Sequence, residues 1–174
     1  MDTSAMSFIT SLAATIWIGV SFDLLFWTLG FYTITIILKN AKLRYWLLLG
    51  AIVGLGLLNK ISMLWFSAGL AAGLILTQSR SLLLTKGAWL AALIAICLFV
   101  PHIVWQVQHD WPTLEFMRNA TSIKMADNPP SKFILQQARS MSYFTLPIWI
   151  AGLFFYFSKR GSLFRPLGWI YVFT

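Results

Sequence analysis

Lys60 is the residue whose type and position most directly indicate chemistry. It separates two apolar stretches, residues 45–59 and 61–78. An ammonium group is a compact point charge that suits a phosphate, and neutralising a departing phosphate helps the bond to it break. The simpler interpretation is that Lys60 extends to lipid head groups and has no other role. We therefore treat Lys60 as a candidate phosphate-binding residue.

Asp23 is a second isolated charge, and it precedes the apolar run Leu24–Leu38. A carboxylate at the start of a helix is stabilised by the helix macrodipole, which is a purely structural role. The functional alternative is an active-site carboxylate, because a charge beside apolar helices carries the cost of burial in a membrane. The sequence thus makes Asp23 a candidate catalytic residue that holds or orients a substrate or a metal.

A third group of polar and aromatic residues lies further along the chain. His102 could act as a general acid or base. Trp105, His109 and Trp111 could contact a substrate, although tryptophan also anchors proteins at membrane interfaces. The two histidines have no cysteine nearby and only Asp110 as a close carboxylate, a pattern that does not indicate zinc. We assign no residue as a metal ligand. A bound divalent ion is possible, but no pattern of ligand residues indicates one.

These residues lie in a chain whose composition excludes an ordinary soluble surface. Of its 174 residues, 59% are hydrophobic and 10% are charged, and the mean hydropathy is +0.76. A soluble domain carries about 25% charged residues. The chain is therefore expected to be an integral membrane protein.

Six apolar runs approach the roughly 20 residues that cross a bilayer as a helix. The runs are Ser7–Val20, Leu24–Leu38, Tyr45–Leu58, Ile61–Thr77, Ala88–Val107 and Met141–Ser158. A further run, Pro166–Thr174, begins a seventh span that stops short. We predict an all-α, polytopic transmembrane helical bundle of about six spans plus a truncated seventh. Residues 1–174 would form a single integral membrane domain, expected to be part of a longer protein.

The formal net charge of +8 is better explained by membrane topology than by nucleic-acid binding. No basic stripe is interleaved with exposed aromatic residues, so nucleic acid is not an expected partner. Basic residues cluster in three loops, at residues 39–44, 80–86 and 159–165. The positive-inside rule puts these loops in the cytoplasm, which requires an inside start and six crossings. Asp23, Lys60 and the segment 102–140 would then lie on the outer face.

Residues 108–140 are predicted to form a long outer-face loop, and loops of this length are usually functional or disordered. Within the loop, Ser131–Met141 has the spacing of a short interfacial helix. Elsewhere, small residues predict close helix packing. The packing could lie within the hairpin of the runs Tyr45–Leu58 and Ile61–Thr77, which we favour, or at a dimer face. These small residues are Gly50, Gly54, Gly56, Gly69 and Gly73.

Three stretches of the chain resemble a known family. They are YWLLLGAIVGLGLLNK at 45–60, SFDLLFWTLGFY at 21–32 and PHIVWQVQHDWPTLEF at 101–116. Together they resemble membrane glycosyltransferases of GT-C architecture. The closest branch comprises bacterial relatives of dolichyl-phosphate-mannose protein mannosyltransferases and lipid A aminoarabinose transferases.

The resemblance implies that a sugar is transferred from a polyprenyl-phosphate donor, with inversion, to a lipid, glycan or protein acceptor. The transfer would occur at the periplasmic or lumenal face, in a multi-pass protein of the bacterial inner membrane that serves the cell envelope. The family's catalytic acid lies in a first outer loop ahead of the matched region, and Asp23 matches a second acidic position. The alternatives are a transporter or flippase for a lipid or sugar, and a non-catalytic membrane subunit.

Overall fold

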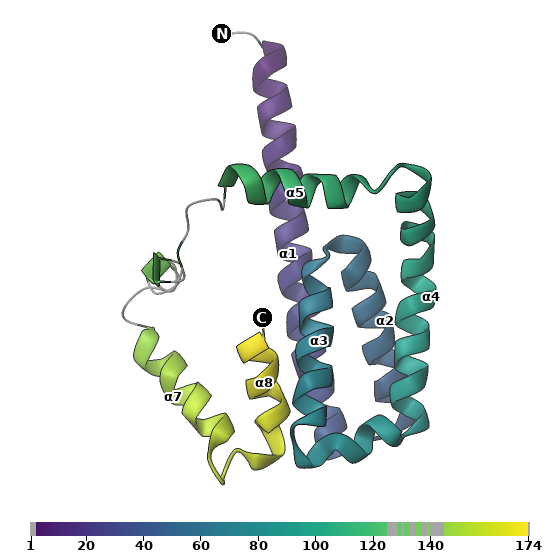
Figure 1. Cartoon of the computed structure of the whole chain (residues 1–174), viewed down its shortest axis with the longest axis vertical. Coiled ribbons are helices and arrows are strands. Elements are labelled where there is room, and N and C mark those ends of the chain that lie inside the picture. Colours follow the sequence, from purple (N-terminus) through teal and green to yellow (C-terminus); the bar gives the residue numbers. More distant parts are fainter. Residues whose placement is uncertain are drawn as a thin grey trace. The chain divides into compact units, whose positions relative to one another are not determined.

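The computed structural model describes residues 3–124, 129, 131–132, 135–136, 139 and 145–173, with side chains described from residue 17 onward except at residues 120–124. Regular structure in these residues is entirely helical, which confirms the predicted all-α class (Figure 1). The chain divides into two units. Unit 1 comprises Met1–Val100 and Leu163–Thr174, and unit 2 comprises Pro101–Ser162.

Unit 1 is a group of helices arranged around a central hairpin. Its elements are α1 (Thr3–Lys39), α2 (Leu43–Asn59), α3 (Ser62–Ile75), the 3-10 helix η1 (Gln78–Leu84), α4 (Lys86–Gln108) as far as Val100, and α8 (Arg165–Phe173). Helices α2 and α3 form the hairpin. Helix α1 packs along α2, and α8 packs along α3. The run at 166–174, which we expected to begin a further span, thus forms a short helix against α3.

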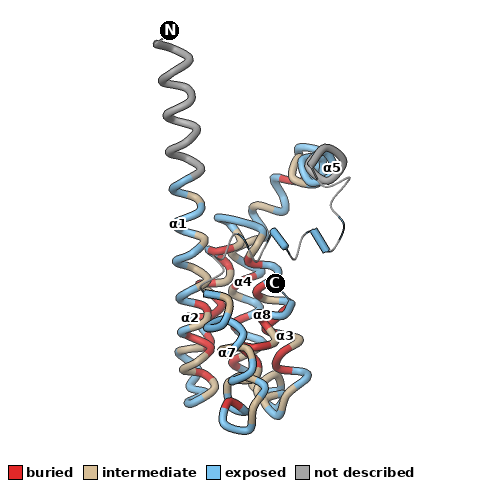
Figure 2. Tube along the Cα trace, turned by 90° about the vertical axis from the view of Figure 1, so that its left-hand side faces the viewer, coloured by how far each residue is buried: buried red, intermediate tan, exposed pale blue. Residues whose placement is uncertain are grey.

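The core of unit 1 lies where these helices meet, as the buried segments of α2, α3 and α8 in Figure 2 show. Its most deeply buried large side chains are Ile34, Ile37, Met63, Phe66, Leu74 and Ile170. These six side chains are apolar, so their burial leaves no side-chain donor or acceptor among them without a hydrogen bond. Close packing among them holds α1, α3 and α8 together.

Small residues bring the helix backbones close together, but not where the sequence predicted. A Cβ on Gly50 would lie 2.5 Å from the carbonyl oxygen of Ala91 in α4. A Cβ on Gly73 would lie 2.6 Å from the carbonyl oxygen of Pro166, in the first turn of α8. The glycines of α2 and α3 therefore mainly receive α4 and α8, and not each other, because two helices joined by a short turn meet along other faces.

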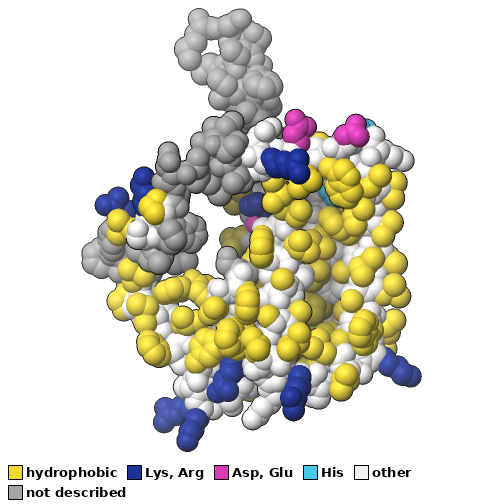
Figure 3. Space-filling model, viewed as in Figure 1, with side chains coloured by type: hydrophobic (Ala, Val, Ile, Leu, Met, Phe, Trp, Pro, Cys, Tyr) yellow, Lys and Arg dark blue, Asp and Glu magenta, His cyan; other side chains and the backbone are white. Residues whose placement is uncertain are grey.

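The surface of unit 1 is apolar over much of its area. Figure 3 shows hydrophobic side chains spread over α3 and α4. Exposed examples are Leu64, Trp65, Trp89, Leu93 and Ile96. Among the described residues, Trp17–Lys39 within α1 and the whole of α4 are long and apolar enough to cross a membrane, and α2, α3 and α7 are shorter apolar helices. Exposed apolar area of this extent is typical of a protein surrounded by lipid.

The predicted break between the first two apolar runs is wrong, because α1 is continuous from Thr3 to Lys39. Two hydroxyl groups of this region bond within the helix: Ser21 Oγ donates to the Trp17 carbonyl at 2.9 Å, and Thr28 Oγ1 to that of Leu24 at 2.8 Å. No proline interrupts the run. Asp23 is therefore inside a helix and does not cap its start.

The continuous α1 also changes the predicted order of crossings. One helix replaces two, so the first turns of α1 lie toward the α2–α3 turn and not toward the basic loops (Figure 1). The remaining arrangement agrees with the prediction. The α1–α2 and η1–α4 junctions, which carry the basic residues Lys42 and Lys86, lie at one end of unit 1, and the α2–α3 turn lies at the other (Figure 1).

Unit 2 contains the end of α4, α5 (Pro112–Lys124) and α7 (Leu146–Phe157), with η2 (Ser162–Phe164) at its boundary. Helix α4 continues through Pro101. Helix α5 occupies part of the predicted loop 108–140, and it was missed because its composition is mixed. Pro112 at the first position and Glu115 in the first turn favour its start. The predicted helix Ser131–Met141 lies mostly outside the described residues.

Candidate functional site

The turn between α2 and α3 is centred on Lys60. Helix α2 ends because Lys60 takes an extended conformation, with φ −156° and ψ 136°. Its backbone N–H still donates to the Gly56 carbonyl at 2.8 Å, and its own carbonyl accepts from the Met63 N–H at 3.2 Å. Both backbone groups of Lys60 are thus satisfied inside the turn, which leaves its side chain to interact elsewhere.

Asp23 of α1 meets this turn. The Lys60 Nζ lies 3.3 Å from Asp23 Oδ2, and the Ser62 hydroxyl donates to Asp23 Oδ1 at 2.7 Å. Ser62 is the first residue of α3, so the carboxylate lies at the positive end of that helix. The macrodipole interaction expected from the sequence therefore exists, but with a helix other than the one that contains Asp23.

Asn59 adds a second bond between the turn and α1. Its Nδ2 donates to the Gly19 carbonyl at 3.2 Å. Gly19 and Asp23 lie four residues apart, on one face of α1. The turn is therefore fixed to α1 along a full helical turn. Sequence reasoning did not assign this contact, although the Asn-Lys pair between two apolar runs was its available signal.

The two charged side chains differ in exposure. The Asp23 side chain is 17% exposed and the Lys60 side chain is 50% exposed. An ammonium group has three N–H donors, and one suffices for Asp23. Lys60 therefore has donors that can bind a second anion, while Asp23 keeps it in place. A phosphate is such an anion.

Apolar and aromatic side chains lie beneath the charged pair. Trp27, one helical turn from Asp23, meets Phe66 edge to face with ring centroids 5.4 Å apart, and Phe31 meets the same ring at 5.3 Å. The Trp27 Nε1 is buried and has no partner among the described residues. The charged pair thus lies at the end of an apolar helical body, where fewer water molecules compete for it.

An apolar cavity of about 160 Å³ opens separately between α2, α3, η1 and α4. Its lining includes Val53, Ser67 and Ala95 and contains no charged side chain. Such a cavity suits a hydrocarbon chain and not a phosphate.

In unit 2, the corner between α4 and α5 is held by Gln106, which is 4% exposed. Its Oε1 accepts from the Thr113 backbone N–H at 3.2 Å, and its Nε2 donates to the Thr113 hydroxyl and to His102 Nε2, the latter at 3.1 Å. Because the Thr113 N–H can only donate, the orientation of the amide is fixed. The Gln106 amide must then donate to His102, whose Nε2 is therefore an unprotonated acceptor.

The predicted residues His102 and Trp105 of α4, together with His109 just after the helix, form a row of rings. The rings of Trp105 and His109 stack with centroids 4.5 Å apart, and those of His102 and Trp105 with centroids 6.2 Å apart. His109 Nδ1 lies 2.8 Å from the Trp105 carbonyl, which can only accept, so Nδ1 carries the proton. His109 as a whole residue is exposed.

Asp110 and Trp111 form the turn that follows this row. Both have positive φ values, 58° and 59°, which is uncommon for residues other than glycine. The Trp111 N–H donates to the Gln106 carbonyl at 2.9 Å, which helps to hold the turn. Sequence reasoning found the aromatic residues but missed Gln106, the residue that organises them.

No group of three His, Cys, Asp or Glu side chains that could hold a metal ion occurs among the described residues. The predicted site residues thus fall into two groups, each within one unit. Asp23 and Lys60 are in direct contact in unit 1. His102, Trp105, His109 and Trp111 lie close together in unit 2.

Comparison with known proteins gives one family. A model of the family described as dolichyl-phosphate-mannose-protein mannosyltransferase matches residues 4–105. The match covers α1 except its first residue, all of α2 and α3 and most of α4, and so includes Asp23 and Lys60. Comparisons with curated proteins and with solved structures give no significant match.

Proposed function

Because the chain belongs to the dolichyl-phosphate-mannose-protein mannosyltransferase family, we propose that it acts in sugar transfer from a polyprenyl-phosphate donor. The family match and the apolar helices support a membrane glycosyltransferase of the GT-C type. The proposal adds the donor lipid, an acceptor that is a lipid, glycan or protein, and the periplasmic or lumenal face. It also adds a multi-pass arrangement in the bacterial inner membrane.

The Asp23–Lys60 pair is the observation that carries this proposal. Lys60 is half exposed and has N–H donors beyond the one that Asp23 needs. In the transfer, the acceptor oxygen bonds to the anomeric carbon, and the bond from that carbon to the phosphate oxygen breaks. Polyprenyl phosphate leaves with the electron pair, and the proton of the acceptor O–H passes to a general base. Lys60 would stabilise the negative charge that develops on this leaving group.

Asp23 would have two roles in this site. It fixes the position of Lys60, and it holds or orients the acceptor or a metal near the anomeric carbon. The Ser62 hydroxyl occupies one carboxylate oxygen and Lys60 lies against the other, so the carboxylate is held in one orientation. His102 as a general acid or base, and Trp105, His109 and Trp111 as substrate contacts, remain part of the proposal.

The donor lipid would use the apolar surfaces of unit 1. The cavity between α2, α3 and α4 has the character needed for a section of a prenyl chain. Its lining residues Val53 and Ser67 are each seven positions from Lys60, or about 10 Å along their helices at 1.5 Å per residue. A phosphate on Lys60 could thus have its hydrocarbon chain in or beside the cavity.

The test is release of polyprenyl phosphate from a labelled lipid-linked sugar by the protein in detergent. We expect Lys60→Met to reduce donor use by tenfold or more, roughly the effect of removing one charge-assisted bond to the leaving group, and Lys60→Arg to reduce it less. Lys42→Met is the matched control, because Lys42 is an exposed basic residue at the other end of the hairpin. Equal activity of wild type, Lys60→Met and Lys60→Arg would contradict the phosphate role. Movement of the label across liposomes without bond cleavage would indicate a transporter instead.

A further inference from the structure

Over Pro112–Arg118, helix α5 has an apolar half and a charged half. Leu114, Phe116 and Met117 are exposed over 47%, 70% and 47% of their surfaces. At 3.6 residues per turn these three side chains spread over one half of the helix. Glu115 and Arg118 project from the opposite half. The helix therefore has the pattern of a segment that lies between an apolar and an aqueous medium.

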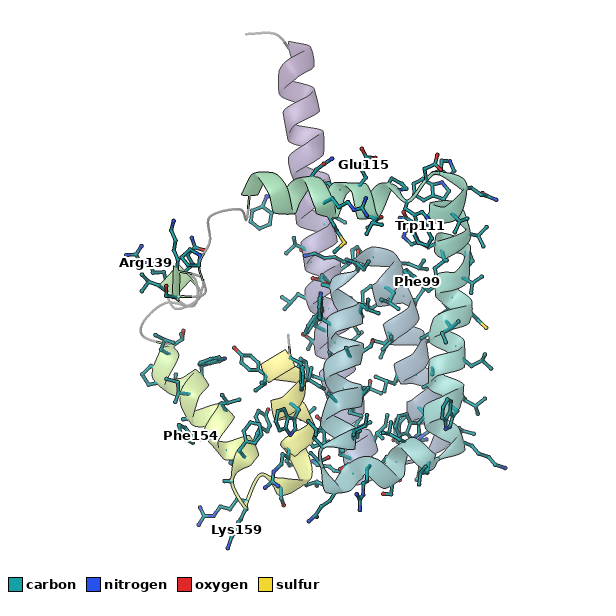
Figure 4. The ribbon with its side chains drawn as sticks, viewed as in Figure 1. Phe99, Trp111, Glu115, Arg139, Phe154 and Lys159 are labelled. Atoms are coloured by element: carbon teal, nitrogen blue, oxygen red, sulfur yellow. The ribbon has the colours of Figure 1, made fainter. Side chains whose placement is uncertain are left out.

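The Gln106 bonds determine which half of α5 faces α4. Thr113 bonds to Gln106 through both its backbone N–H and its hydroxyl. On the helical wheel Thr113 lies near the middle of the apolar half, between Phe116 and Met117. The apolar half is therefore turned toward the last turns of α4. Figure 4 agrees, since Glu115 projects from the side of α5 that faces away from α4.

The last turns of α4 are themselves apolar on the outside. Val104 and Val107 are 48% and 55% exposed. Helix α4 has 23 residues and is about 34 Å long at 1.5 Å per residue, slightly more than the roughly 30 Å of a hydrocarbon core. Its end therefore reaches the boundary of a bilayer that it crosses. Helix α5 begins four residues later, after the turn formed by Asp110 and Trp111.

We propose that α5 is an interfacial helix, with its apolar half in the boundary between the head groups and acyl chains of a lipid bilayer. The lipid that surrounds the end of α4 continues beneath α5, because the Gln106 bonds turn the apolar half of α5 to the same side. Glu115 and Arg118 face water. Trp111 lies at the corner, at the depth where tryptophan is enriched in membrane proteins. The proposal does not depend on the sugar-transfer function.

The test is spin labelling of the full chain in liposomes of phosphatidylcholine and phosphatidylglycerol. Cys97, which is exposed, is first replaced in the variant Cys97→Ser. Single cysteines are then introduced by Leu114→Cys, Phe116→Cys and Met117→Cys on the apolar half, and by Glu115→Cys and Arg118→Cys on the charged half. Val104→Cys in α4 is the reference for a lipid-exposed position. Collision of the nitroxide with oxygen reports lipid, and collision with a soluble nickel chelate reports water.

We expect the three apolar positions to resemble the reference, with an oxygen-to-nickel ratio at least about twofold above that of positions 115 and 118. Nickel access at all five positions would overturn the proposal, because α5 would then lie in water. Protection of positions 114, 116 and 117 from both reagents would also overturn it and would indicate a protein partner. Three independent positions keep the test valid if one variant fails to fold.

Discussion

Two turns of this chain hold polar groups in an apolar protein, and they use different chemistry. The α2–α3 turn relies on a charged pair, Asp23 and Lys60, from helices far apart in the sequence. The α4–α5 corner relies on the neutral amide of Gln106, whose partners lie four and seven residues away. The first turn thus fixes one part of the chain to a distant part, and the second fixes a local change of direction.

The difference also separates a binding site from a structural joint. Gln106 is 4% exposed, and both of its N–H donors and its oxygen are used within the corner. The Lys60 side chain is 50% exposed and has donors beyond the one that faces Asp23. A side chain that binds a ligand needs hydrogen-bond donors that are not already bonded to other groups of the protein. By this criterion Lys60 can bind a substrate, whereas Gln106 can only position other residues.

The largest effect on stability is expected from Gln106→Leu. The substitution keeps the approximate volume but removes the bonds to Thr113 and His102, which leaves a backbone N–H and a hydroxyl without their partner. The free energy of unfolding should fall by about 2 kcal/mol, the typical cost of buried polar groups that lose their bonds. Amide hydrogen exchange in detergent measures this loss of stability. In the Gln106→Leu variant, the amides of α5 should exchange faster than those of α2.

Gln106→Glu is the matched control for this change. A carboxylate still accepts from the Thr113 N–H but has no proton to donate to His102 Nε2. We therefore expect a loss of stability that is smaller than the loss caused by Gln106→Leu. Equal stability of wild type and Gln106→Leu would show that the corner does not depend on the amide.

The charged turn was easier to predict than the neutral corner, for a physical reason. A lysine between two apolar runs has few tolerable positions in a membrane, so Lys60 was recognised from composition and spacing alone. Glutamine is uncharged and carries no such signal. The Gln106–Thr113 contact also depends on the turn at Asp110 and Trp111, whose positive φ values no local pattern predicts.

The pairing of Asp23 with Lys60 could not be predicted from the sequence either. The polar residues around Asp23 were interpreted as a break between two helices, which would have put Asp23 at a helix start. In fact α1 is continuous, because Ser21 and Thr28 bond to carbonyls of their own helix. The carboxylate is instead stabilised by Lys60 and Ser62, residues brought to it by the hairpin.

A smaller effect on stability is expected from the charged pair. Asp23→Asn and Lys60→Met should show a coupling free energy of about 1 kcal/mol or less in a double-mutant cycle, because Lys60 is half exposed. The coupling should decrease as salt is added, since salt screens exposed charges. The effect of Gln106→Leu should not change with salt. This contrast directly tests the distinction between the two turns.

The Asp23–Lys60 pair also leads to a prediction about substrate binding, in which the direction of the change in KM tests the role of Lys60. If Lys60 binds the donor phosphate, Asp23→Asn removes a neighbouring negative charge, and the KM for the lipid donor should fall or stay unchanged while kcat falls. Lys60→Met should raise the KM for the donor. If both variants lose activity to the same extent, and if conditions that restore their stability also restore the activity, the pair is only a structural contact between α1 and the hairpin.

The smallest effect is expected from Asn59→Ala, which removes the bond from Asn59 Nδ2 to the Gly19 carbonyl at 3.2 Å. Asn59 is exposed, so other donors can reach that carbonyl, and the loss should be about 0.5 kcal/mol. Asn59→Asp is the sharper variant, because it places a negative oxygen against an oxygen that can only accept, and it adds a second carboxylate near Lys60. Thermal unfolding in detergent should therefore rank wild type above Asn59→Ala, and Asn59→Ala above Asn59→Asp. If both variants unfold with the wild-type midpoint, the polar attachment of the turn to α1 depends on Asp23, through its contacts with Lys60 and Ser62.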